Sequence, residues 1–167
     1  MIATFWRNFC EGIGVVASIP ARTVFGDTSE LQTQLCDLVL SGQKRATASL
    51  AEWYGEGRDP LPEAGDLSIV LDGHGIPRGV IEITHVRVGP FSSVDEAFAA
   101  DEGEDDCSLG YWIGEHQRYF TSEQHKDGRL FAENDMVVFE RFKIDLARVC
   151  HWLDACKHRT APGWVFK

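Results

Sequence analysis

Three polar side chains in the first part of the chain are of types that together could hydrolyse an amide or a phosphodiester. Lys44 and Thr47 stand close together, and Glu82 follows inside an apolar segment. A threonine hydroxyl becomes a useful nucleophile only when a neighbouring base takes its proton. Lysine could be that base if burial lowered its pKa well below about 10.4, or it could stay charged and stabilise an oxyanion. Both roles for Lys44 stay open here, and Glu82 is the candidate acid or base.

Glu82 needs a partner if its side chain faces the core. It stands between Ile81 and Ile83, and an unpaired buried carboxylate is costly. We therefore expect an ion pair between Glu82 and Lys44. The same pair also has a purely structural interpretation, in which Thr47 is an ordinary strand residue. Spacing alone favours neither interpretation.

The element that must position Lys44 is a helix between Asp27 and Gly42. Asp27 and Glu30 have the spacing of a capping box, and an apolar stripe follows at helical spacing (Leu31, Leu35, Leu38 and Val39). Gly42 is typical of the left-handed residue that follows a helix. In a regular strand, residues 44 and 47 would point to opposite faces. A bend after Gly42 would let both side chains meet one ligand.

Helices and strands are expected to alternate irregularly over the rest of the chain. Helices are expected at 3–10, 94–100 (capped by Ser93) and 108–120, and strands at 67–71, 80–88 and 136–144. No βαβ rhythm connects them. The pattern therefore indicates an α+β domain with a mixed or antiparallel sheet.

Composition limits the class of partner. Sixteen Lys and Arg against 26 Asp and Glu give a formal net charge of -10, which disfavours a long nucleic acid held by its phosphates. A small ligand or a short single-stranded stretch fits better. No run of apolar residues is long enough to span a membrane, so no membrane partner is expected. Five scattered cysteines are typical of reduced thiols in the cytoplasm.

Several other polar and aromatic residues are candidates for ligand contacts. Arg45 could contact a phosphate, and Trp53 and Tyr54 could stack on a base, with Ser49 beside them. Alternatively, Trp53 belongs to the core and Arg45 is a solvated charge. The acidic run at 101–106 is interpreted as a solvated connection between helices. Cysteines and histidines at 150–158 fit no standard zinc module, so we expect no metal and no cofactor.

Several motifs recur in the order of a known family. They are Phe25-Gly26-Asp27, the segment 38–49, the segment 61–66, the acidic Glu102-Gly103-Glu104-Asp105 and the closing Glu140-Arg141-Phe142. Together they resemble the ASCH domain family over residues 3–144, and more narrowly its bacterial branch with an N-terminal Phe-Trp helix, here Phe5-Trp6. One departure is Asp105, which stands where the family motif commonly has a glycine.

This resemblance implies a PUA-like fold, a small mixed β-barrel with flanking helices. It implies an N-terminal helix and loop at 1–24, the ASCH domain at 25–144 and a C-terminal extension at 145–167. Some relatives resemble hydrolases that remove an acetyl group from the exocyclic amine of cytidine with a Lys, a Thr and a Glu, which correspond here to Lys44, Thr47 and Glu82. Other relatives are credited with ribonuclease activity.

The resemblance thus implies a metal-independent hydrolase that acts on RNA or an RNA-derived modified nucleoside. The alternative is a non-catalytic RNA- or nucleotide-binding module that uses the same cleft. The sequence leaves monomer and homodimer equally open.

Overall fold

A computed structural model of the chain describes residues 1–14 and 17–144. The expected C-terminal extension and the cysteines and histidines at 150–158 lie outside these residues. No helix in the described part combines the length and the apolar character needed to cross a membrane.

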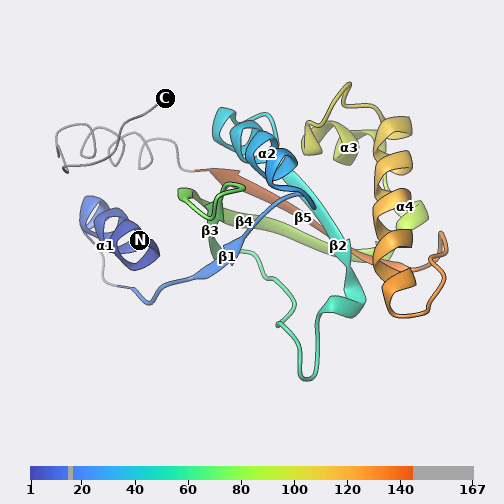
Figure 1. The fold of residues 1–167 in the computed structure, drawn as a ribbon, viewed down its shortest axis with the longest axis horizontal. Coiled ribbons are helices and arrows are strands. Elements are labelled where there is room, and N and C mark those ends of the chain that lie inside the picture. The colour runs from blue at the N-terminus through green and yellow to red at the C-terminus, as the bar shows by residue number, and fades with distance from the viewer. Residues whose placement is uncertain (15–16, 145–167) are drawn as a thin grey trace.

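Five strands form one mixed sheet, which curls into a half-barrel (Figure 1). Their order in the sheet is β1 (Ala21–Thr23), β3 (Leu67–Leu71), β4 (Pro77–Pro90), β5 (Met136–Ile144) and β2 (Ala46–Leu50). β1 pairs in parallel with β3, and the other neighbours are antiparallel. The predicted α+β class with a mixed sheet is therefore confirmed. β1 and β2 are the edge strands, so the half-barrel is open between them.

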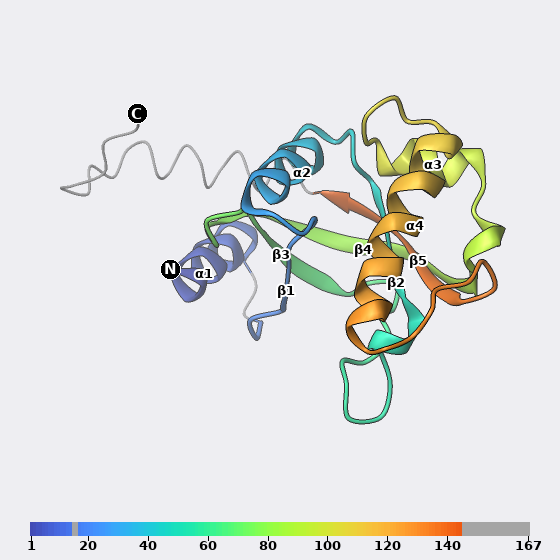
Figure 2. The same cartoon turned by 45° about the vertical axis from the view of Figure 1, so that its right-hand side comes forward.

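Four α-helices of the described part flank the sheet: α1 (Ile2–Ile13), α2 (Ser29–Ser41), α3 (Glu96–Glu102) and α4 (Leu109–Lys126). Two short 3-10 helices, η1 (Ala51–Trp53) and η2 (Phe91–Ser93), follow β2 and β4. Figures 1 and 2 both show α1 at one end of the sheet and α3 and α4 at the other. α2 lies between these ends and leads directly into β2.

The two faces of the sheet are covered by different helices because side chains alternate along each strand. On one face, Phe5, Trp6 and Phe9 of α1 pack against Ile69 and Val80. On the other, the stripe of α2 packs against the opposite set of strand residues (Leu35, Cys36 and Val39 against Val70, Ile81, Ile83 and Phe142). The predicted apolar stripe of α2 is confirmed.

The chain bends between α2 and β2, as the placement of Lys44 requires. Gly42 is left-handed with φ 78°, as predicted, and the Lys44 backbone N–H donates to the Leu38 carbonyl at 3.0 Å. β2 begins only at Ala46.

Two predicted helix caps are wrong by one or two residues. Thr28, and not Asp27, caps α2, because Thr28 has extended backbone angles and its hydroxyl accepts from the Leu31 N–H. Asp95 replaces Ser93 at the start of α3 for the same reason.

Candidate functional site

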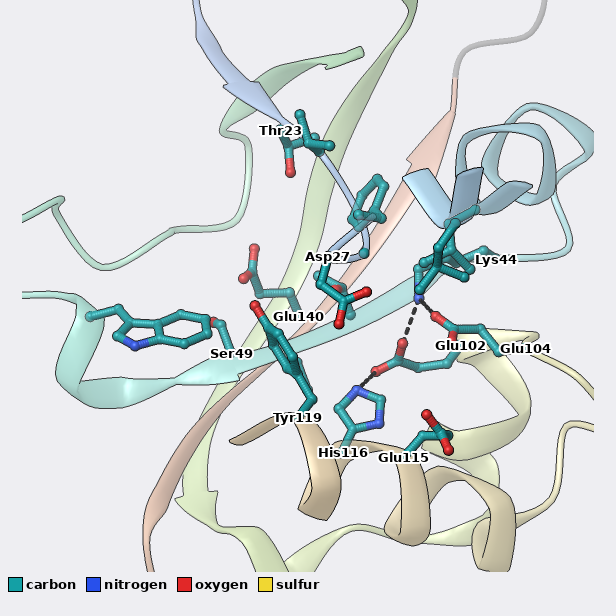
Figure 3. A pocket seen from close by; sticks show the side chains of 18 of the residues that line it. Thr23, Asp27, Lys44, Ser49, Glu102, Glu104, Glu115, His116, Tyr119 and Glu140 are labelled. Carbon is teal, nitrogen blue, oxygen red and sulfur yellow. Dashed lines mark hydrogen bonds and ion pairs between the residues drawn. The ribbon is translucent and has the colours of Figure 1, made fainter. Parts of the chain in front are cut away.

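A pocket of about 260 Å³ lies where the half-barrel is open. Its walls come from the segment that follows β1, from β2 and η1, from the end of α3, from α4 and from β5. Thr23 of one edge strand and Thr47 of the other both line it. Figure 3 shows the side chains that converge there. We call it the Lys44 pocket.

Lys44 is the buried cation of this pocket. Its Nζ atom lies 2.5 Å from Glu102 Oε2 and 2.6 Å from Glu104 Oε1. The side chains of Lys44 and Glu102 are each 1% exposed, and that of Glu104 is 21% exposed. Burial acts to lower the pKa of Lys44, but the two carboxylates together hold it above its ordinary value. The direction of this shift favours the charged form of Lys44 and disfavours its use as a general base.

Glu102 connects Lys44 to helix α4. One carboxylate oxygen accepts from Lys44, and the other accepts from Trp112 Nε1 at 2.9 Å and lies 3.4 Å from His116 Nε2. His116 stacks on Trp112 with ring centroids 4.0 Å apart. Burial raises the pKa of Glu102, but Lys44 and His116 outweigh it and lower that pKa to about 2. Glu102 is thus a fixed anion.

Thr47 and Glu140 lie opposite each other in the β2–β5 ladder. Register partners in an antiparallel pair carry their side chains on the same face, and both residues line the Lys44 pocket. Within residues 1–14 and 17–144, neither side chain has a hydrogen-bond or ion-pair partner. Glu140 is only 8% exposed. Burial, together with the negative charges of Asp66 and Glu102, raises its pKa to about 7.

The expected pair between Lys44 and Glu82 is wrong. Glu82 lies opposite Leu67 and Lys143 in the sheet, on the face that α1 covers, and its carboxylate is 3.1 Å from Lys143 Nζ. It is not among the residues that line the Lys44 pocket. Because side chains alternate, burying Ile81 and Ile83 under α2 turns Glu82 to the other face.

The other predicted contacts are divided between the pocket and the surface. Ser49, Trp53 and Tyr54 line the pocket, and the hydroxyls of Ser49 and Tyr54 are hydrogen-bonded at 2.8 Å. Arg45 does not line it, because its side chain turns outward and binds Asp101 at 2.9 Å. The second interpretation of Arg45, as an exposed charge, is the one that fits its position.

The structure brings carboxylates to the pocket that were not predicted from the sequence. The acidic run was interpreted as a solvated connection, yet Glu102 and Glu104 are the partners of Lys44. Glu140 was noted only as part of the closing family motif, and neither Glu140 nor His116 was expected in the pocket. The available signal was the acidic family motif itself, since a lysine beside an apolar helix end requires an anion from elsewhere in the chain.

Two left-handed residues shape the loop that carries these carboxylates. Gly103, between Glu102 and Glu104, has φ 68°, and its carbonyl accepts from Gln43 Nε2 at 2.7 Å. Asp105 has φ 45°. This conformation is free for glycine and tolerated by aspartate, which explains how Asp105 replaces the glycine common in the motif.

Comparisons with known proteins find a matching family and similar solved structures. A family model for the ASCH domain matches residues 21–144. The chain is similar to the crystal structure of an ASCH domain from Lactobacillus crispatus JV V101, with 32% identity, a TM-score of 0.77 and coverage of 85% of this chain and 92% of that one. It is also similar to a protein from Enterococcus faecalis V583, with 34% identity, a TM-score of 0.77 and coverage of 86% and 92%. No curated protein matches the chain.

Proposed function

The chain belongs to the ASCH domain family, and we propose that its Lys44 pocket binds an RNA-derived modified nucleoside and hydrolyses an amide on it. The observation that carries the proposal is the buried ammonium of Lys44, held by Glu102 and Glu104 in the same pocket as Thr47. A fixed positive charge in the same pocket as a hydroxyl can assist acyl transfer, because negative charge develops on the carbonyl oxygen in the transition state.

Lys44 supplies the positive charge in this mechanism. Its ammonium has three N–H groups, and Glu102 and Glu104 are its two hydrogen-bond partners in the described part of the chain. The third N–H is left to stabilise an oxyanion in the pocket. No metal ion is needed for that role.

Thr47 and Glu104 complete the chemistry. The hydroxyl of Thr47 attacks the amide carbon, or orients a water that does so, while the free oxygen of Glu104 takes the proton. The proton then passes to the nitrogen as the C–N bond breaks, and the amine leaves. If Thr47 attacks, a water hydrolyses the resulting ester and restores the hydroxyl, with Glu104 again transferring the proton.

The charge of the pocket favours a nucleoside over an RNA phosphodiester. Five carboxylates line it (Asp27, Glu102, Glu104, Glu115 and Glu140), against the cations Lys44 and Arg118. A phosphate would meet this excess of negative charge, whereas a neutral base would not. The volume of about 260 Å³ lies just below the usual range of about 300–1,000 Å³ for small-molecule sites, which fits a small ligand. Ser49, Trp53 and Tyr54 are proposed to contact the base.

We also propose a cytoplasmic location. The free thiols of Cys10, Cys36 and Cys107 are consistent with it.

The burial of Lys44 also favours a second candidate function. An ammonium that is 1% exposed and bound to two carboxylates could serve only to hold the pocket in shape. The protein would then be a non-catalytic module that binds RNA or a nucleotide in the same pocket.

The two candidates are separated by a product assay. Wild type, Thr47→Val and Lys143→Met are incubated with acetylated cytidine and with a short single-stranded RNA, and products are followed by chromatography. Thr47→Val removes the hydroxyl at nearly constant volume, and Lys143→Met is the control on the other face of the sheet. Release of acetate by wild type and the control, but not by Thr47→Val, supports the amidohydrolase. Binding without any product supports the binding module, and cleavage of the RNA alone would indicate a ribonuclease.

A further inference from the structure

Glu140 is a buried carboxyl group whose hydrogen-bonding capacity is unused within residues 1–14 and 17–144. Buried polar groups in proteins are normally paired. In the described part of the chain, the one fully enclosed side-chain oxygen or nitrogen without a partner is Gln124 Oε1. The oxygens of Glu140 are therefore not sealed in the core, and Glu140 lines the Lys44 pocket. The carboxyl oxygens of Glu140 are therefore available to form hydrogen bonds with a ligand in the pocket.

The groups around Glu140 disfavour its charged form. Asp66 and Glu102 add negative charge, and Tyr54 is the nearby titratable group from the segment after β2. The two cations of the pocket are already paired, Lys44 with Glu102 and Glu104 and Arg118 with Glu115. The remaining titratable groups that line the pocket are Asp27, His116 and Tyr119. Burial and these anions raise the pKa of Glu140 to about 7.

The protonated form of Glu140 has a specific hydrogen-bonding pattern. A neutral carboxylic acid presents one O–H donor and one C=O acceptor side by side. The complementary partner is a planar group with an acceptor next to a donor. The aromatic side chains of Trp53, Tyr54 and Tyr119 line the same pocket, and Figure 3 shows Glu140 on the side toward Ser49 and Tyr119, away from Glu104. A flat ring is therefore the shape that this side of the pocket suits.

We propose that Glu140 anchors the ligand by pairing with the edge of a nucleobase that presents a ring nitrogen beside an exocyclic N–H, as cytosine and its N4-acylated forms do. The choice of a nucleoside rests on the function proposed above, but the inference concerns binding and not bond cleavage. Since Thr47 is the register partner of Glu140, an edge held by Glu140 brings its exocyclic nitrogen close to Thr47. Glu140 then determines which bases enter, and Thr47 acts on the group they carry.

This pairing makes binding depend on pH in a defined direction. One proton lies between Glu140 and the ring nitrogen of the bound base. Below the pKa of about 7 that proton is already on Glu140, so affinity is constant. Above it, each bound base must take up a proton from solution, so Kd rises about tenfold per pH unit.

Calorimetric titration with cytidine as the probe tests the inference, because cytidine has the required edge and no acyl group to hydrolyse. Wild type, Glu140→Gln, Glu140→Ala and the exposed control Glu133→Gln are compared from about pH 6 to about pH 9. A glutamine amide keeps one donor and one acceptor at every pH. Glu140→Gln should therefore bind with little pH dependence, while Glu140→Ala should lose roughly 30-fold in affinity for two lost hydrogen bonds. Wild type and Glu133→Gln should share the rise in Kd above about pH 7.

A second probe, 3-deazacytidine, lacks the ring nitrogen. Wild type should bind it more weakly than cytidine and without the rise in Kd at high pH. The inference is overturned if wild type does not bind cytidine, if Glu140→Ala binds it as tightly as wild type, or if Glu140→Gln keeps the wild-type pH dependence. Thermal unfolding confirms that each variant is folded. Binding as described but without turnover of acetylated cytidine would contradict the proposed hydrolysis and leave the inference on Glu140 intact, whereas turnover that Glu140→Ala leaves unchanged would contradict the inference alone.

Discussion

The Nζ atom of Lys44 lies 2.5 Å from Oε2 of Glu102, and both side chains are 1% exposed. The two residues are 58 positions apart in the sequence. Their pair joins the bend between α2 and β2 to the end of α3, and it also fixes the charge of the pocket. One contact therefore serves both the fold and the proposed chemistry, so variants of Lys44 require a measurement of stability as well as of activity.

Replacing Lys44 with methionine should destabilise the fold strongly. Removing one partner of a buried pair leaves the other charge unpaired, at a typical cost of about 3–5 kcal/mol. Lys143→Met removes an exposed lysine whose pair with Glu82 is largely solvated, and such pairs contribute about 0–1 kcal/mol. The free energy of unfolding in urea checks both values. Equal losses for the two variants would mean that Glu102 is not an isolated buried anion when Lys44 is removed.

Glu140→Gln should stabilise the protein at alkaline pH. The folded state raises the pKa of Glu140 from 4.5 to about 7. Protonated Glu140 therefore makes its full contribution to the free energy of unfolding below about pH 4.5, and wild type loses that contribution as the pH rises through 7. A shift of this size corresponds to about 3 kcal/mol. Because glutamine does not titrate, the difference between the two proteins should grow from pH 5 to pH 8. Urea unfolding across this range checks it, and parallel stability curves would contradict the raised pKa.

Gly103→Ala should damage both stability and the site. At φ 68° an added Cβ would be 2.5 Å from the carbonyl oxygen of Gln43, which is backbone and cannot move aside. The backbone around residue 103 would therefore have to shift, and this would move Glu102 and Glu104 away from Lys44. Gly114→Ala is the matched control, since an added Cβ there meets nothing within 4 Å and alanine in a helix gains about 0.5–1 kcal/mol. The unfolding temperature and the turnover should both fall for Gly103→Ala and should stay at the wild-type level or above for Gly114→Ala. If the two variants give the same values, the loop tolerates another conformation.

The sequence predicted much of the fold because local patterns determine it. The apolar stripe of α2, the left-handed Gly42 and the strands at 67–71 and 136–144 all depend on residues close together in the chain. Helix caps were less accurate, since Asp27 and Thr28 are both good caps and only backbone angles choose between them.

The candidate site was predicted only in part, because it depends on contacts between distant segments. Lys44 and Thr47 were found through their spacing after a helix end and through the family resemblance. The partner of Lys44 was not, since nothing local distinguishes the carboxylate of Glu82 from that of Glu102. Alternation along β4 turns Glu82 away from the pocket, and the packing of α3 and α4 buries Glu102 within an apparently solvated acidic run.

Glu104 and Glu82 should differ in their effect on turnover. Glu104→Gln should lower turnover of acetylated cytidine sharply, because Glu104 contacts Lys44 and is the proposed proton acceptor. Loss of a general base typically costs about 10²–10⁴-fold in rate. Glu82→Gln should leave turnover unchanged, since Glu82 lies on the other face of the sheet. A loss of turnover in Glu82→Gln alone would instead support the catalytic role that the sequence predicted for Glu82.

The most direct test of the account is whether the purified protein releases acetate from acetylated cytidine, and whether Thr47→Val does so. Wild type should release acetate and cytidine in equal amounts, and Thr47→Val should release none above background, with cytidine binding retained by both. The absence of product from wild type that still binds cytidine, or equal product from Thr47→Val, would contradict the proposed hydrolysis at Thr47.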